Sequence, residues 1–186
     1  AARLAAGDCG GVLSAVDGRG GRAEYDPAAA GGRGEFTLHV PTQMPNPMQK
    51  QVAQVLGLET DQVRVVVPDV GGGFGGKNSL FPEYGLALLA ARLLGRPVKW
   101  YGDRSSSFVS DHAGRDSVVE GELALDADGN ILAVRITGAG NMGAYLSTVG
   151  AHVQTGNILK NVISVYRTPA VAVHMRCVFT NTVAVS

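Results

Sequence analysis

The chain has 186 residues, a hydrophobic content of 45% and 16 side chains of each charge, so its formal net charge is zero. A chain of this length and composition can bury one sizeable core. The balanced charge argues against nucleic-acid binding and against binding to an anionic membrane surface. No apolar run is long enough to span a membrane and no signal-like segment opens the sequence, so we expect a cytoplasmic location.

Cysteine and histidine do not form a recognisable metal site in this sequence. Cys9 and Cys177 lie far apart and no Cys-x-x-Cys pair occurs, which argues against an iron–sulfur centre or a structural zinc ion. Cys177 lies in an apolar run and is expected to be a small buried residue. The remaining candidates show no spacing typical of metal ligands: His39, His112, His152 and His174.

The N-terminal third predicts an irregular start followed by a strand and a helix. Residues 1–33 are rich in Ala, Gly and Arg without periodicity, so we expect an irregular, linker-like segment there. Alternation over residues 34–40 predicts a strand. Asn46 with the following proline predicts the start of a helix, which runs to Leu56 and ends at Gly57.

A glycine-rich loop follows a valine-rich strand at residues 63–67. Residues 71–77 read Gly-Gly-Gly-Phe-Gly-Gly-Lys, and so many glycines cost enough backbone entropy to indicate a binding loop. Such a loop can present backbone N–H groups to an anionic or oxo group. Phe74 is the largest side chain in it and is expected to pack beside a bound molecule.

The rest of the sequence predicts alternating helical and extended segments. Pro82 opens a helix that Gly95 ends, and we expect its apolar stripe to lie in the core. Residues 98–101 predict a short strand, and residues 117–125 and 131–137 predict a hairpin. Residues 141–160 predict a loop and a helix, and residues 171–179 a last strand. The fold class expected is α+β, with mixed layers of sheet and helices. The apolar stripe of the helix between Pro82 and Gly95 consists of Leu86, Leu89, Ala90 and Leu93.

A nucleotide-binding function is one alternative for the loop. The spacing from Gly71 to Lys77 satisfies most of the phosphate-binding pattern of nucleotide hydrolases. Asn78, however, stands where Ser or Thr would hold magnesium, and no downstream strand ends in a metal-binding Asp. A domain that only mediates interactions is a further alternative.

Several motifs accompany the loop: Thr42-Gln43 and residues 95–100, 103–104, 114–116, 141–145, 166–169 and 180–182. In order and spacing, the chain from about Glu24 to its end resembles the molybdenum-binding large subunit of the xanthine dehydrogenase, aldehyde oxidase and aerobic carbon monoxide dehydrogenase family. Purine-hydroxylating members carry charges where this chain has Asn78 and near Asn157, so a purine substrate is disfavoured. Residues 82–83, 100–101 and 144–148 look closer to the carbon monoxide dehydrogenase-like branch.

The resemblance implies a partial molybdopterin-binding domain over residues 34–186, with a molybdenum–molybdopterin cofactor and a cytosine dinucleotide form as one option. It implies that Gln43 and Phe74 lie beside molybdenum without binding it directly. A helix cap or turn is the structural alternative for Gln43. Lys77 would hold the cofactor or orient the loop. The implied cofactor-binding residues are Gln43, Gly72, Gly73, Phe74, Gly75 and Gly76. A purely structural role, as an ion-pair scaffold, is expected for Asp103, Arg104, Arg115 and Asp116.

The resemblance also implies a reaction and partner subunits. The activity is oxidation of an aldehyde, an N-heterocycle or carbon monoxide, with water as the source of oxygen. The general-base glutamate is expected outside these residues, so we expect a catalytically inert fragment of a larger subunit. Electrons would pass to an iron–sulfur small subunit and an FAD-binding medium subunit.

Overall fold

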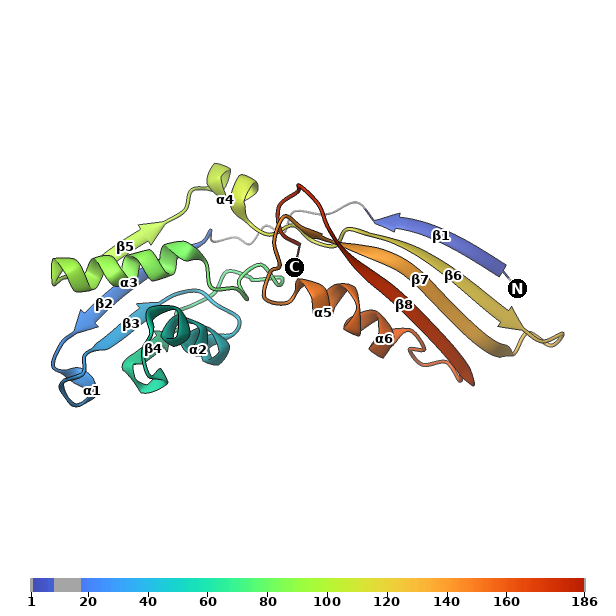
Figure 1. Ribbon diagram of the computed structural model, residues 1–186, viewed down its shortest axis with the longest axis horizontal. Coiled ribbons are helices and arrows are strands. Elements are labelled where there is room, and N and C mark those ends of the chain that lie inside the picture. Colours follow the sequence, from blue (N-terminus) through green and yellow to red (C-terminus); the bar gives the residue numbers. More distant parts are fainter. Residues whose placement is uncertain (1, 9–17, 186) are drawn as a thin grey trace. The chain divides into compact units, whose positions relative to one another are not determined.

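The computed structural model describes residues 2–8 and 18–185, with side chains from residue 18 onward. It divides into two compact units (Figure 1). The loop unit is Ser14–Ser110, and the hairpin unit combines Ala1–Leu13 with Asp111–Ser186. Both contain helices and sheet, which confirms the expected α+β class.

A four-stranded mixed sheet forms the centre of the loop unit, in the order β4-β3-β2-β5. Strand β2 (Gly20–Asp26) runs antiparallel to both β3 (Glu35–His39) and β5 (Val98–Tyr101). Strand β3 runs parallel to β4 (Val63–Val66). Parallel neighbours end at the same edge of a sheet, so the segments that follow β3 and β4 emerge side by side.

Two helices cover one face of this sheet and close its core. Helix α2 (Pro45–Leu56) and helix α3 (Pro82–Leu94) end at glycines in the left-handed conformation, Gly57 and Gly95, as predicted. Helix α2 starts at Pro45 with Met44 as N-cap, slightly before the predicted Asn46. Short helices complete the unit: α1 (Ala29–Gly32), η1 (Thr60–Gln62) and α4 (Arg104–Ser110). The core side chains include Phe36, Leu38, Met48, Val52 and Leu88.

The buried face of α3 differs from the predicted one. Its buried residues are Tyr84, Ala87, Leu88 and Ala91, whereas Leu86 is 64% exposed and Leu93 80%. The prediction that the Leu86 stripe lies in the core is therefore wrong for this structure. Helix α3 carries apolar side chains on both faces, and periodicity cannot select between two apolar faces.

The prediction of an irregular segment over residues 1–33 is also wrong where strands form. Residues Ala2–Asp8 form β1, and Gly20–Asp26 form β2 between β3 and β5. In β2, Ala23 is fully buried, and a Cβ at Gly21 would meet the Tyr84 ring of α3 at 3.5 Å. Small residues fit this narrow space under a helix, but they lack the alternation by which a strand is predicted.

The hairpin unit is a second four-stranded sheet, in the order β1-β6-β7-β8. Strands β6 (Ser117–Leu125) and β7 (Ile131–Gly143) form the predicted hairpin, although β7 continues beyond residue 137. Helices α5 (Gly150–Gln154) and α6 (Gly156–Asn161) follow, and β8 (Ala170–Phe179) returns parallel to β7. Helix α5 packs on β7 and β8.

Asn141 is the centre of a hydrogen-bond network at one end of this sheet. Its amide nitrogen donates to Asp116 Oδ2 at 2.7 Å and to Thr182 Oγ1 at 3.0 Å. Its amide oxygen accepts from the Gly143 N–H at 2.7 Å and from the Thr180 hydroxyl at 2.8 Å. The two motifs around positions 141 and 181 therefore stabilise each other, and Asp116 belongs to this network.

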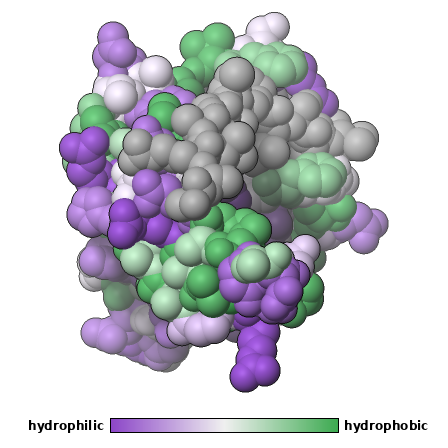
Figure 2. All heavy atoms as spheres, turned by 90° about the vertical axis from the view of Figure 1, so that its right-hand side faces the viewer, coloured by the Kyte–Doolittle hydropathy of each residue, from purple (hydrophilic) through white to green (hydrophobic). Residues whose placement is uncertain are grey.

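The described surface mixes apolar and polar side chains (Figure 2). In β8, Val171 is 40% exposed and Phe179 59%. Cys177 is also exposed, so the prediction that it is buried is wrong. Among residues 2–8 and 18–185, no helix has the length and apolar character needed to cross a membrane.

Candidate functional site

The glycine loop lies beside the segment that follows β3. Pairing between β3 and β4 extends to the Val40 N–H, which donates to the Val66 carbonyl at 3.0 Å. Beyond this point the Thr42 hydroxyl donates to the Lys77 carbonyl at 2.9 Å, and the Gln43 N–H approaches the same oxygen at 3.4 Å. Thr42 is only 4% exposed. The parallel strands β3 and β4 thus position the two segments that follow them, Thr42-Gln43 and the glycine loop, although these segments lie far apart in the sequence.

Gln43 contacts the loop directly through its side chain. The backbone N–H of Gly75 donates to Gln43 Oε1 at 3.0 Å. Since only the oxygen of a carboxamide can accept from an N–H group, this bond fixes which end of the amide faces the loop. Gln43 and the loop therefore lie together. We call Gln43 with residues 72–76 the glycine-loop site.

Several hydrogen-bond donors at this site have no acceptor among the described residues. Within the described part of the chain, the Gln43 NH₂ group donates to no acceptor. The same holds for the backbone N–H groups of Gly72, Gly73 and Phe74. The Gly76 N–H instead closes a turn onto the Gly73 carbonyl at 2.8 Å. A set of neutral donors at one place suits an oxo or anionic group.

Phe74 has an unusual backbone and an open ring. Its φ is 50°, in the left-handed region that a phenylalanine rarely adopts. Its side chain is 67% exposed, and the ring lies against the backbone of Gly72, where an added Cβ would be 2.7 Å from Cε2. A strained, exposed aromatic residue in a binding loop is a candidate for ligand contact.

The other predicted residues lie in supporting positions. Lys77 is 5% exposed and its carbonyl holds the loop to Thr42. The Asp103 carboxylate accepts from the Ser106 N–H at 2.7 Å, and this bond lowers the pKa of Asp103 below its ordinary value. Asp103 thus accepts a hydrogen bond from the backbone, and Asp116 accepts one from the Asn141 side chain. These contacts stand in place of the ion pairs that we expected for the two carboxylates.

Arg19 is a supporting residue that sequence reasoning missed. It is 4% exposed, and its guanidinium lies 4.1 Å from the centre of the Phe81 ring. It donates to Ser110 Oγ at 2.6 Å and to Glu83 at 3.4 Å. These contacts join α3 to the end of α4. A single arginine in a glycine-rich segment gives no sequence signal for such a role.

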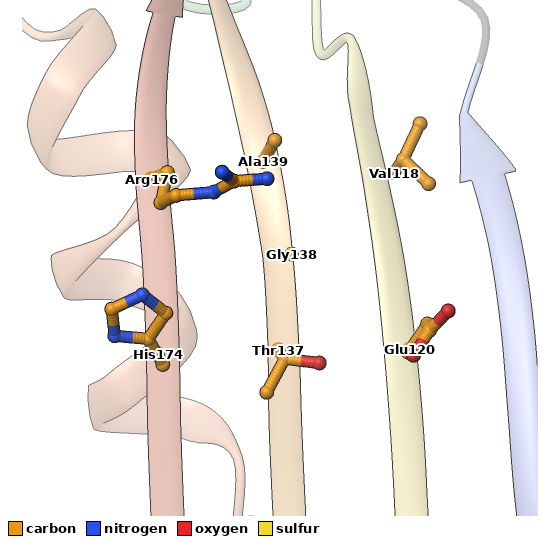
Figure 3. Close-up of a pocket in the computed structure, with 7 residues that line it drawn as sticks. All are labelled: Val118, Glu120, Thr137, Gly138, Ala139, His174 and Arg176. Carbon is orange, nitrogen blue, oxygen red and sulfur yellow. The ribbon is translucent and has the colours of Figure 1, made fainter.

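A separate hollow lies on the polar face of the hairpin-unit sheet (Figure 3). Glu120, Thr137 and His174 stand opposite one another on β6, β7 and β8, and Val118, Ala139 and Arg176 form the next such row. Side chains in such cross-strand rows lie close enough to interact, and the polar row of Glu120, Thr137 and His174 is typical of a solvated sheet face. No group of three metal-ligating side chains occurs among the described residues.

The loop geometry does not support the nucleotide-binding alternative. In a phosphate-binding loop the lysine lies at the start of the following helix, with its amine free to reach the phosphates. Here Lys77 is buried, and α3 begins only at Pro82.

Comparison with known proteins places the chain in a family. The sequence model of the family described as the molybdopterin cofactor-binding domain matches residues 19–186 of the chain. The chain belongs to this family, which confirms the resemblance drawn from its motifs.

The relatives include subunits of two different dehydrogenases. The chain is 37% identical to the carbon monoxide dehydrogenase large chain of Hydrogenophaga pseudoflava over 66% of its own length and 15% of that protein. It is 38% identical to the gamma subunit of the 6-hydroxypseudooxynicotine dehydrogenase complex of Paenarthrobacter nicotinovorans, over 70% of its own length and 16% of that subunit.

A solved structure shares the fold along the whole chain. Quinoline 2-oxidoreductase from Pseudomonas putida 86 superposes with a TM-score of 0.87 and 32% identity, over 100% of this chain and 23% of that one. The chain therefore spans less than a quarter of the length of these three proteins.

Proposed function

We propose that the glycine-loop site holds the molybdenum–molybdopterin cofactor of a molybdenum hydroxylase. The observation that carries this proposal is the fixed Gln43 carboxamide, whose oxygen is bound by the Gly75 N–H while its NH₂ group stays available. An amide donates without titrating, so a nearby metal charge cannot change its protonation. The backbone donors of Gly72, Gly73 and Phe74 extend the same polar surface.

The residues present suit such a cofactor. When bound, the cofactor supplies the two-electron redox chemistry by which a carbon atom gains an oxygen atom from water. The chain's own residues bind and orient. Gln43 donates to an oxygen atom of the metal centre, the loop amides face its polar groups, and the Phe74 ring limits access of water beside it. Gln43 and Phe74 lie beside the metal without being its ligands.

We extend the proposal to the whole protein. It is an oxidoreductase that oxidises an N-heterocycle, an aldehyde or carbon monoxide, and its general-base glutamate lies outside the 186 residues. Relatives named as a large chain and as a complex subunit support a multi-subunit assembly, with an iron–sulfur small subunit and an FAD-binding medium subunit. A cytosine dinucleotide form of the pterin and a cytoplasmic location belong to the same proposal.

The test measures the cofactor that the full-length subunit carries. We expect the purified protein to contain molybdenum and to release a pterin that becomes fluorescent after oxidation. A Gln43→Glu variant should keep its fold and lose turnover. Protein that carries a nucleotide and no pterin would contradict the proposal and would revive the nucleotide-binding alternative.

A further inference from the structure

Two adjacent glycines lie directly under the two side chains of the glycine-loop site. A Cβ atom built on Gly73 would overlap the Gln43 carboxamide, with Cδ, Oε1 and Cγ as its nearest atoms. A Cβ atom built on Gly72 would lie 2.7 Å from Cε2 and 3.3 Å from Cζ of the Phe74 ring. Each glycine thus leaves a space that one of the two side chains fills.

We propose that Gly72 and Gly73 are positioning residues for the molybdenum site, Gly72 for the Phe74 ring and Gly73 for the Gln43 carboxamide. This inference rests on the proposed function. Gln43 is exposed, and among the described residues its carboxamide has one hydrogen bond, from the Gly75 N–H. Contact with the bare backbone at Gly73 is what lets the carboxamide reach that N–H group.

Gly73 is the better of the two positions for an experiment. Gly72 has φ +98°, so any substitution there also strains the backbone. Gly73 has no left-handed φ, so alanine can adopt its backbone conformation. The atoms that a new methyl group would meet first belong to the far end of the Gln43 side chain, which can swing away. Gly73→Ala should therefore fold normally and displace Gln43.

The experiment uses the full-length enzyme with four variants: Gly73→Ala, Gln43→Ala, the double variant and the control Gly85→Ala. Gly85 lies within α3, and an added Cβ there would meet nothing within 4 Å. Turnover, molybdenum content and deuterium exchange of the Gly75 amide are measured for each. Exchange at Gly75 reports on its hydrogen bond to Gln43 whether or not the enzyme is active.

We expect Gly73→Ala to speed Gly75 exchange and to lower turnover about tenfold or more, as loss of a group that orients a metal centre does. In the Gln43→Ala background, Gly73→Ala should have no further effect on either readout, because the group it displaces is already gone. Gly85→Ala should match the wild-type enzyme in both.

The results that would overturn the inference are distinct from the one that would overturn the proposed function. Unchanged Gly75 exchange in Gly73→Ala, or effects on turnover that multiply in the double variant, would show that Gly73 does not act through Gln43. Unchanged turnover in Gln43→Ala would instead overturn the proposed function, whatever the exchange data show.

Discussion

The carboxamide oxygen of Gln43 accepts a hydrogen bond from the backbone N–H of Gly75, although helix α2 and strand β4 separate the two residues in the sequence. Because the carboxamide oxygen faces the Gly75 N–H, the NH₂ group of Gln43 points away from that N–H. A side chain fixed in this way is a preorganised donor, since it needs no further ordering when a ligand binds.

The first prediction tests the NH₂ donor of the Gln43 carboxamide separately from its oxygen acceptor. In the full-length enzyme, Gln43→Glu keeps an acceptor for the Gly75 N–H and removes the donor. We expect turnover to fall about 10- to 100-fold, with a melting temperature close to that of the wild type because Gln43 is exposed.

The matched control is a glutamine of the same unit that bonds only to backbone. Gln49 Nε2 donates to the Val63 carbonyl at 2.7 Å and to the Thr60 carbonyl at 3.2 Å. Gln49→Glu should cost about 1–3 kcal/mol of stability and leave turnover per folded molecule intact. Equal turnover in both variants would refute the assigned role of Gln43.

The second prediction concerns Phe74. Because its ring is 67% exposed and its backbone is left-handed, Phe74→Ala should cost little stability and most of the activity. Phe36 is 1% exposed in the core, so Phe36→Ala should cost about 3–5 kcal/mol. Melting temperature and turnover are measured together for both variants. A drop in melting temperature for Phe74→Ala as large as that for Phe36→Ala would show that Phe74 is a core residue.

The third prediction compares two glycines of the hairpin unit that both have positive φ. At Gly129, with φ +85°, an added Cβ would meet nothing within 4 Å, whereas at Gly143, with φ +74°, it would overlap the Val183 backbone. Gly129→Ala should therefore cost only the backbone strain, about 1–2 kcal/mol. Gly143→Ala should cost about 3 kcal/mol or more, since the added methyl group also forces the Val183 backbone to move. Thermal unfolding of both variants tests the difference, and equal losses would contradict it.

The fourth prediction concerns pH. Arg33 donates to Asp61 and lowers the pKa of that carboxyl below its ordinary value of 3.8. The folded state therefore favours the ionised form, and the pair's contribution to stability is present above pH 3.8 and is lost as the pH falls through the lowered pKa.

Acid unfolding of the wild type and of Arg33→Gln measures this contribution. The two curves should differ above about pH 4 and converge at lower pH. The difference should be small, because both side chains are exposed to solvent. A stability difference that grows as the pH falls would contradict the assignment.

Sequence reasoning found most elements but not the face that α3 buries. Its two ends carry local signals, Pro82 and Gly95, and both were placed correctly. Its buried face depends on whether Leu88 or Leu86 meets β2, and both are leucines. Strand β2 is not predicted from the sequence for a related reason, since its burial depends on tertiary packing around small residues such as Ala23.

The site was predictable in part. The glycine loop is apparent from composition alone, whereas Gln43 was singled out only by the family resemblance. No local pattern reports a hydrogen bond between a side chain after β3 and a backbone N–H after β4, because the parallel register of the two strands creates it. The spaces over Gly72 and Gly73 likewise exist only once the loop has folded.

The position of molybdenum in a crystal structure of the full-length enzyme, located by anomalous scattering at the molybdenum edge, tests most directly whether Gln43 and Phe74 lie beside the metal. We predict a peak on the side of the loop to which the Gln43 NH₂ group points, with an oxygen atom of the metal centre about 3 Å from that nitrogen. A molybdenum peak remote from Gln43 and Phe74, or a Gln43 NH₂ group bonded only to protein, would contradict it.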